Sequence, residues 1–247
     1  MSHLSQSWFS SRLRREVQVV RWGETGTPII FFPTAAGDAE EVERFLMVDA
    51  LAPLLEAGRA KLYSVDSVPG QVWLSEDNRP PYATAIQNSF DSFIVNELVP
   101  AIYADCGGNE LEIVATGASI GAYNALAAIC RHPGIFSSAI CLSGTFDLSK
   151  FIEGDMDEDW YRASPLHFVP NLPQDHDDLE QLRNRFVLLA HGTGRWESPE
   201  ESWRVAEVLG SRQIPNRVDE WGPEWDHDWP TWRRMLPEYL DTLLPED

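Results

Sequence analysis

The sequence predicts an α/β fold with a mostly parallel central sheet and helices on both faces. Short apolar runs that suit buried strands alternate along the chain with amphipathic or Ala-rich segments that suit helices. The 247 residues are 43% hydrophobic, which is enough to bury a substantial core. Because no repeat or linker divides the chain, we expect residues 1–247 to form a single domain.

The strands are indicated by short apolar runs, several of them bounded by Pro or Gly. The first run alternates weakly and suits an edge strand, whereas the second ends at Pro33 and suits a central strand. In chain order, the expected strands are residues 17–21, 28–32, 61–66, 111–116, 138–143, 185–190 and 216–221.

The helices are indicated by apolar spacing and by local helix breakers. The segment that begins at residue 83 repeats apolar residues at steps of three and four, which is typical of an amphipathic helix. An Ala-rich helix ends at His132-Pro133-Gly134, and an earlier helical segment is interrupted by Pro53. The expected helices are residues 40–58, 83–104, 120–131, 203–210 and 231–244. Two stretches are expected to be irregular, residues 67–82 and an acidic, loop-rich insertion at about 150–178.

The main chemical motif is Gly117-Ala118-Ser119-Ile120-Gly121, the G-x-S-x-G pattern of a nucleophile elbow. It lies between an expected strand and an expected helix, where a sharp turn is required. Its glycines leave room for a strained serine backbone. We therefore predict Ser119 as a nucleophile and the Ile120 amide, at the helix N-terminus, as a donor to an oxyanion. The alternative is a Gly-rich turn with an incidental serine.

A serine hydroxyl needs a base, which in this architecture follows the last strand. His227 stands there, and a surface histidine is the alternative interpretation. The acid is expected after the preceding strand, where Glu197 is the first carboxylate. Other carboxylates near these two positions are Glu200, Glu201, Asp226 and Asp228.

The loop after the second expected strand, Thr34-Ala35-Ala36-Gly37, has amides unobstructed by large side chains, and we predict the Ala35 amide as the second oxyanion donor. Aromatic faces suit apolar acyl groups and sugar rings, so Trp196 and Trp225 are predicted to contact the substrate. Trp229 and Trp232 are expected to pack the closing helix against the sheet.

These motifs resemble the α/β-hydrolase superfamily and, within it, an esterase group that includes feruloyl and acetyl-xylan esterases, S-formylglutathione hydrolases and mycolyl transferases. The resemblance spans residues 27–244 and rests on Phe31-Phe32-Pro33-Thr34, the elbow, Gly192-Thr193-Gly194, and His227-Asp228-Trp229 with Trp232. It implies an α/β-hydrolase fold and a serine carboxylic ester hydrolase working through an acyl-enzyme. In that mechanism Ser119 attacks, His227 moves the proton and Glu197 steadies the imidazolium. Many relatives carry an aspartate at the position of Arg195, which leaves the acid open.

The net charge, the motifs and the cysteine content limit the kinds of molecule that this protein is expected to bind. The net charge of −20 argues against nucleic acid and anionic membranes, which attract Lys and Arg. Neither a phosphate loop nor metal-ligand spacing is visible, so no cofactor or metal is expected. Three scattered cysteines, no export signal and no long apolar run favour a cytoplasmic protein. The expected partner is a small-molecule ester such as an acylated sugar. Acyl transfer or thioester hydrolysis on the same triad, and a non-catalytic binding protein of this fold, remain alternatives; the oligomeric state stays open.

Overall fold

The computed structural model describes residues 2–73, 80–108, 110–151 and 157–245. Its centre is an eight-stranded sheet in the order β1-β2-β4-β3-β5-β6-β7-β8. The strands are β1 His3–Ser10, β2 Arg15–Trp22, β3 Thr27–Phe32, β4 Ala60–Val65, β5 Ile113–Ala118, β6 Phe136–Leu142, β7 Phe186–His191 and β8 Asn216–Glu220. Pairing is antiparallel from β1 through β2 to β4 and parallel from β4 to β8.

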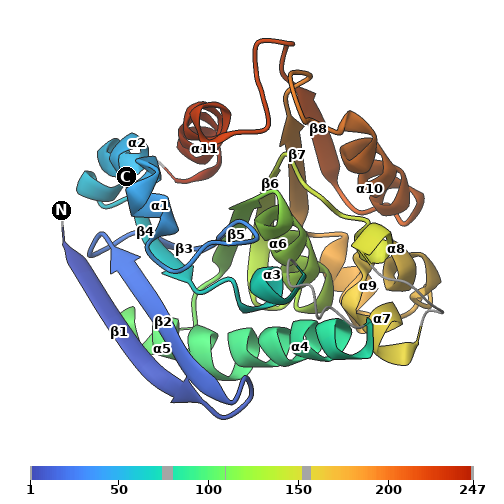
Figure 1. Ribbon diagram of the computed structural model, residues 1–247, viewed down its shortest axis with the longest axis horizontal. Coiled ribbons are helices and arrows are strands. Elements are labelled where there is room, and N and C mark those ends of the chain that lie inside the picture. The colour runs from blue at the N-terminus through green and yellow to red at the C-terminus, as the bar shows by residue number, and fades with distance from the viewer. Residues whose placement is uncertain (1, 74–79, 109, 152–156, 246–247) are drawn as a thin grey trace.

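Helices cover both faces of this sheet (Figure 1). The α-helices are α1 Glu41–Arg44, α2 Met47–Glu56, α3 Val68–Trp73, α4 Pro80–Phe93, α5 Val99–Asp105, α6 Ile120–Arg131, α7 Glu158–Ala163, α8 Pro165–Phe168, α9 Asp177–Leu182, α10 Pro199–Ser211 and α11 Trp229–Leu243. Short 3-10 segments stand at Leu148–Phe151 and Val169–Asn171, and a π-helical turn at Ile94–Leu98 joins α4 to α5. None of the described helices has the length and apolar content needed to cross a bilayer.

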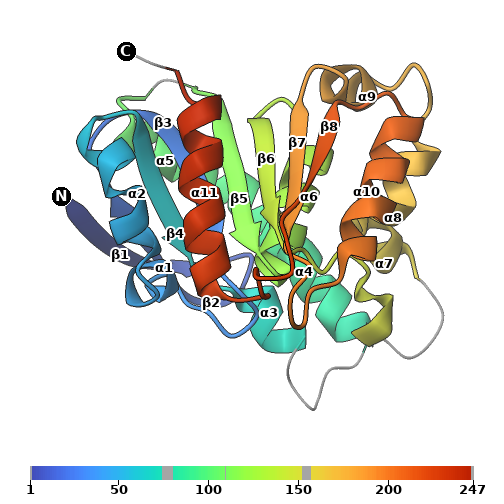
Figure 2. The ribbon, with the colours of Figure 1, turned by 90° about the horizontal axis from the view of Figure 1, so that it is seen from above.

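The central strands are buried on both faces of the sheet, so the protein has two hydrophobic cores, one on each face. Side chains of a strand alternate between its faces, and in β3 Ile30 and Phe32 join one core while Ile29 and Phe31 join the other. The first core packs under α3 to α10, and the second packs under α1, α2 and α11. Figure 2 shows α2 and α11 side by side on the second face. The predicted mostly parallel sheet with helices on both faces is therefore confirmed.

The N-terminal edge of the sheet differs from the prediction. The edge strand is β1, which the sequence analysis did not find, and the predicted edge strand 17–21 lies inside β2. The outer strand is fixed to the π-helical turn, because Trp8 Nε1 and Ser10 Oγ donate to the two carboxylate oxygens of Glu97 at 3.0 and 2.9 Å. Such a turn adds one residue to a helix and re-aims its side chains.

Three other expectations are corrected. The helix predicted at 40–58 breaks at Leu46, whose φ is +61°, and Pro53 lies inside α2 without ending it. The stretch expected to be irregular after residue 66 contains α3, whose proline stands in the first turn, where a missing N–H costs little. The insertion at 150–178 is expected to be rich in loops, but its described part consists largely of short helices. Residues 152–156 of this insertion lie outside the described residues.

Candidate active site

The loops after β5, β6, β7 and β8 leave the same edge of the sheet, because these strands run parallel. Ser119 follows β5, Ser143 follows β6, Glu197 lies beyond β7, and His227 lies between β8 and α11. Ligand sites of open α/β sheets lie at this carboxyl edge. The three predicted triad residues thus lie on loops at the same edge of the sheet.

The turn at Ser119 is strained in the way the elbow motif predicts. Its φ is +57° and its ψ is −121°, which a residue with a side chain rarely adopts. A Cβ on Gly117 would overlap the backbone of Gly121, and a Cβ on Gly121 would overlap the carbonyl oxygen of Phe32. The two glycines therefore let the start of α6 pack directly against the end of β3, which brings Ser119 close to the loop that follows β3.

Ser119 is also joined to the loop after β6. Its N–H donates to the carbonyl oxygen of Leu142 at 3.0 Å, and its own carbonyl accepts from the N–H of Thr145 at 3.2 Å. The register pairs Ala118 with Leu142, so Ser119 and Ser143 are neighbours where the two strands end.

The predicted base and acid lie together. His227 Nδ1 is 3.6 Å from Glu197 Oε2, and the carboxylate side chain is only 1% exposed. The backbone N–H of His227 donates to the carbonyl oxygen of Arg195 at 3.0 Å, which joins the loops after β7 and β8. This distance is longer than that of a good hydrogen bond. Catalytic hydrogen bonds are often this long in the absence of substrate and shorten when the substrate binds.

The surroundings of the acid contain a residue that the sequence analysis missed. Ser143 Oγ donates to Glu197 Oε1 at 2.7 Å, and the N–H of Gly192 donates to the same oxygen at 3.2 Å. Trp232 Nε1 donates to Ser143 Oγ at 2.9 Å, and the Trp232 ring meets the His227 ring edge to face, with centroids 5.2 Å apart. No local motif marks Ser143, since its role depends on the pairing of β5, β6 and β7.

The other carboxylates near the base are occupied elsewhere. Asp226 accepts from the backbone N–H of Arg195 and from two atoms of its guanidinium, at 2.7 to 2.9 Å. Asp228 caps α11 by accepting from the N–H of Trp229 at 2.7 Å. Glu201 accepts from two backbone N–H groups in the loop after β6, and Glu200 is exposed in the first turn of α10. Of these five acids, Glu197 is the one paired with His227.

The loop after β3 is held by a second buried carboxylate, which the sequence analysis also missed. Glu41 is 5% exposed and accepts from the N–H of Thr34 at 2.8 Å and from its hydroxyl at 2.5 Å. Burial raises the pKa of Glu41, and the two hydrogen bonds from Thr34 oppose that effect. These two hydrogen bonds fix Thr34, the residue directly before Ala35, which is the predicted second oxyanion donor. Ile120 is the first residue of α6, where the N–H groups have no intrahelical partner.

The four tryptophans discussed above divide into two pairs. Trp196 is 75% exposed, with φ +63°, and the Arg195 guanidinium lies 5.3 Å from its ring centroid. Trp225 is half-buried and packs edge to face on Trp221 at 5.0 Å. Trp229 and Trp232 are buried in the core under α11, which confirms their predicted packing role.

Comparisons with known proteins identify the family of the chain and confirm its fold. The family described as "Putative esterase" matches residues 63–243. No curated protein matches the chain in sequence.

Solved structures resemble the whole chain. A ferulic acid esterase superposes with a TM-score of 0.72 at 16% identity, covering 98% of this chain and 97% of that one. For an S-formylglutathione hydrolase from Agrobacterium tumefaciens the values are 0.69, 14%, 97% and 93%. For FphF, a fluorophosphonate-binding serine hydrolase of Staphylococcus aureus, they are 0.60, 14%, 99% and 99%. At these identities the likeness shows the α/β-hydrolase fold that the sequence predicts.

Proposed function

Because the chain belongs to this esterase family, we propose that it cleaves carboxylic esters with Ser119 as nucleophile, His227 as general base and Glu197 as the acid of the triad. The observation that carries the proposal is a serine strained at φ +57° on the sheet edge that also holds the His227–Glu197 pair. Strain of this kind gathers at functional sites, and nothing in an ordinary strand-to-helix turn requires it.

The proposed reaction has two steps. Ser119 Oγ attacks the ester carbonyl carbon while His227 removes the hydroxyl proton, and the resulting imidazolium is stabilised by Glu197. The amides of Ile120 and Ala35 stabilise the negative oxygen of the tetrahedral intermediate. His227 then gives the proton to the departing alcohol, and water attacks the acyl-enzyme by the same sequence of proton transfers.

The proposed substrate is a small-molecule ester, and an acylated sugar fits the exposed aromatic side chain on the acid loop. Trp196 offers an open ring face beside a cation, and Trp225 stands half-buried on the neighbouring loop. Aromatic faces pack against apolar acyl groups and against sugar rings. Acyl transfer and thioester hydrolysis would use the same triad and differ only in the groups that enter and leave.

A fluorophosphonate probe tests the proposal, since it labels an activated serine. The wild type should label and should hydrolyse p-nitrophenyl acetate, and Ser119→Ala should abolish labelling and lower kcat by at least about 1,000-fold. Gln213→Gly, at an exposed position outside the site, should leave both measurements unchanged. An inert wild type that still binds esters would instead identify a non-catalytic binding protein.

The identity of the acid is tested by substitutions that remove charge and keep shape. Glu197→Gln should lower kcat by about 100-fold or more, because the imidazolium loses its anionic partner. Glu200→Gln is the matched control, three residues away on an exposed turn, and should leave kcat unchanged. If Asp226→Asn collapses kcat while Glu197→Gln does not, the acid is Asp226.

A further inference from the structure

We propose that Ser143 is a positioning residue that fixes the Glu197 carboxylate for His227, an inference that rests on the proposed function. Ser143 is 3% exposed, and its hydroxyl lies between Trp232 Nε1 at 2.9 Å and Glu197 Oε1 at 2.7 Å. It touches none of the reacting atoms in the proposed mechanism and acts only through the acid.

The direction of the Ser143 hydroxyl follows from its two partners. An indole N–H can only donate, so Ser143 Oγ accepts from Trp232. An ionised carboxylate can only accept, so the hydroxyl proton points to Glu197 Oε1. The chain of donors therefore runs in one sense, from the indole through the serine to the acid, and the serine proton has a single orientation.

The two carboxylate oxygens of Glu197 have different contacts. Oε1 receives two donors, the Ser143 hydroxyl and the Gly192 N–H at 3.2 Å. Oε2 is buried and has no hydrogen-bond partner among the described residues, and it faces His227 Nδ1 at 3.6 Å. With Oε1 held by two donors, the carboxylate cannot rotate without breaking both bonds. Oε2 is thereby reserved for the imidazolium that forms during the reaction.

The backbone of Ser143 also indicates a specific role for this side chain. Its φ is +45°, a conformation that glycine adopts freely and that strains residues with a side chain. Its N–H donates to the carbonyl oxygen of Ala190 at 2.7 Å, which fixes the residue between β6 and β7. A glycine here would relieve the strain, and among the described residues it would remove the two hydrogen bonds of the hydroxyl while keeping that of the backbone N–H.

Ser143→Gly is therefore a clean test, because it removes the hydroxyl and suits the backbone. We expect kcat to fall by about 10- to 100-fold with KM changed less than about twofold, since the lost contact acts on the transition state through the acid. The melting temperature should change little, because relief of the backbone strain at Ser143 offsets the loss of its two hydrogen bonds. Gln213→Gly is the matched control, also at positive φ (+61°) but exposed and away from the site, and should leave kcat unchanged.

A double-mutant cycle separates positioning from a general structural effect. Fluorophosphonate labelling of Ser119 is measured in both backgrounds: Ser143→Gly should slow it by about 10-fold or more in the wild type, and by less than about twofold in Glu197→Gln, because the group it positions has lost its charge. An equal loss in both backgrounds, or wild-type kcat in Ser143→Gly, overturns the inference. Should the glycine variant fail to fold, Ser143→Ala lacks the same hydroxyl and decides the matter by the same measurements.

The outcomes also separate this inference from the proposed function. If the wild type does not label at Ser119, the proposed function fails and takes the role of Ser143 with it. If Ser119, His227 and Glu197 variants lose activity while Ser143→Gly keeps it, only the role of Ser143 is wrong. Trp232→Phe keeps the ring against His227 but removes the indole donor, and we expect a smaller loss than for Ser143→Gly.

Discussion

Glu197 and Glu41, two of the buried glutamates near the carboxyl edge, use their oxygens in different ways. Glu197 keeps one oxygen open toward His227, whereas Glu41 spends both on Thr34. Because both oxygens of Glu41 accept from Thr34, this carboxylate holds the backbone at the end of β3. Glu41 thus sets the course of the loop from which the proposed oxyanion donor, Ala35, comes.

The raised pKa of Glu41 gives a pH prediction. The folded protein binds this proton more tightly than the unfolded chain does, so protonation of Glu41 adds to stability. That contribution is complete below the ordinary value of 4.5 and is lost as pH rises through the folded-state pKa. The free energy of unfolding of the wild type, minus that of Glu41→Gln, should therefore increase as pH falls from about 8 to about 5.

Urea denaturation of both proteins across that pH range measures the difference, in which the titration of other groups cancels. A difference that shrinks at low pH would mean that hydrogen bonds from Thr34 outweigh burial. Glu200→Gln, at an exposed glutamate, provides the comparison against which the profile of Glu41→Gln is judged.

At the level of residues, the sequence predicted what local pattern and chain order determine. The strained turn at Ser119 follows from its glycines, and the pairing of Glu197 with His227 follows from the loops in which they stand; their catalytic roles remain predictions. Ser143 and Glu41 carry no such pattern. Their contacts arise only when distant strands and loops pack together, so a single sequence gives no signal for them.

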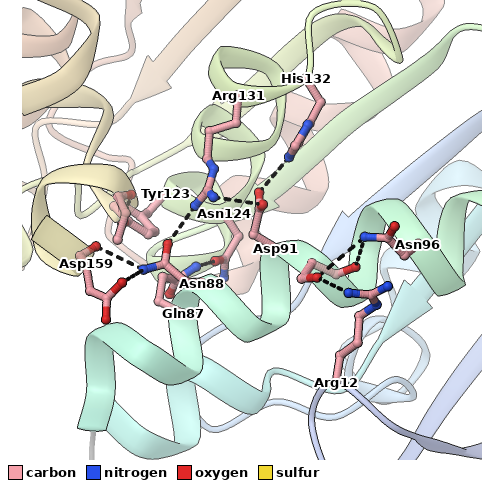
Figure 3. A network of polar contacts seen from close by, with 12 residues as sticks. Arg12, Gln87, Asn88, Asp91, Asn96, Tyr123, Asn124, Arg131, His132 and Asp159 are labelled. Carbon is pink, nitrogen blue, oxygen red and sulfur yellow. Dashed lines mark hydrogen bonds and ion pairs between the residues drawn. The ribbon is translucent and has the colours of Figure 1, made fainter. Parts of the chain in front are cut away.

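Among the elements, α4 is joined to its neighbours by a network of polar contacts (Figure 3). Asp91 accepts from His132 at 2.9 Å and pairs with Arg131 at 3.1 Å, both at the C-terminal end of α6. Asn88 joins Arg131 on one side and Asp159 of α7 on the other. This network joins α4, α6 and α7, which lie on the same face of the sheet.

Removal of the central acid of this network should loosen α4. Asp91→Ala leaves a partly buried guanidinium without its anion, and we expect the free energy of unfolding to fall by about 1–3 kcal/mol. Urea denaturation measures the change. Asp49→Ala, at an exposed aspartate of α2, is the matched control and should stay within about 0.5 kcal/mol of the wild type.

Short elements were the hardest to predict. The helices α7, α8 and α9 have four to six residues, too few for a helical period to appear in the sequence. The residues of β1 are mostly exposed and polar, so this strand gives little apolar signal in the sequence. The break at Leu46 comes from a left-handed backbone at a residue type that seldom adopts it, whereas Pro53, the obvious breaker, is absorbed by α2.

The whole molecule carries a net charge of −20, which repels itself in the compact state. Salt screens that repulsion, so raising NaCl from about 10 to about 200 mM should raise the melting temperature by about 2–5 °C. Calorimetry measures the shift, and KCl should reproduce it if screening is the cause. A falling melting temperature would show that ion pairs such as Arg131–Asp91 outweigh the net repulsion.

The contact between the start of α6 and the end of β3 constrains how this protein can change. Because even one extra carbon on Gly121 would overlap the Phe32 carbonyl, a saturation library at position 121 should return only glycine among active clones. Trp196, by contrast, stands exposed on a surface loop and tolerates replacement sterically. Directed evolution toward new esters therefore has its open routes in the loop after β7, while the elbow stays invariant.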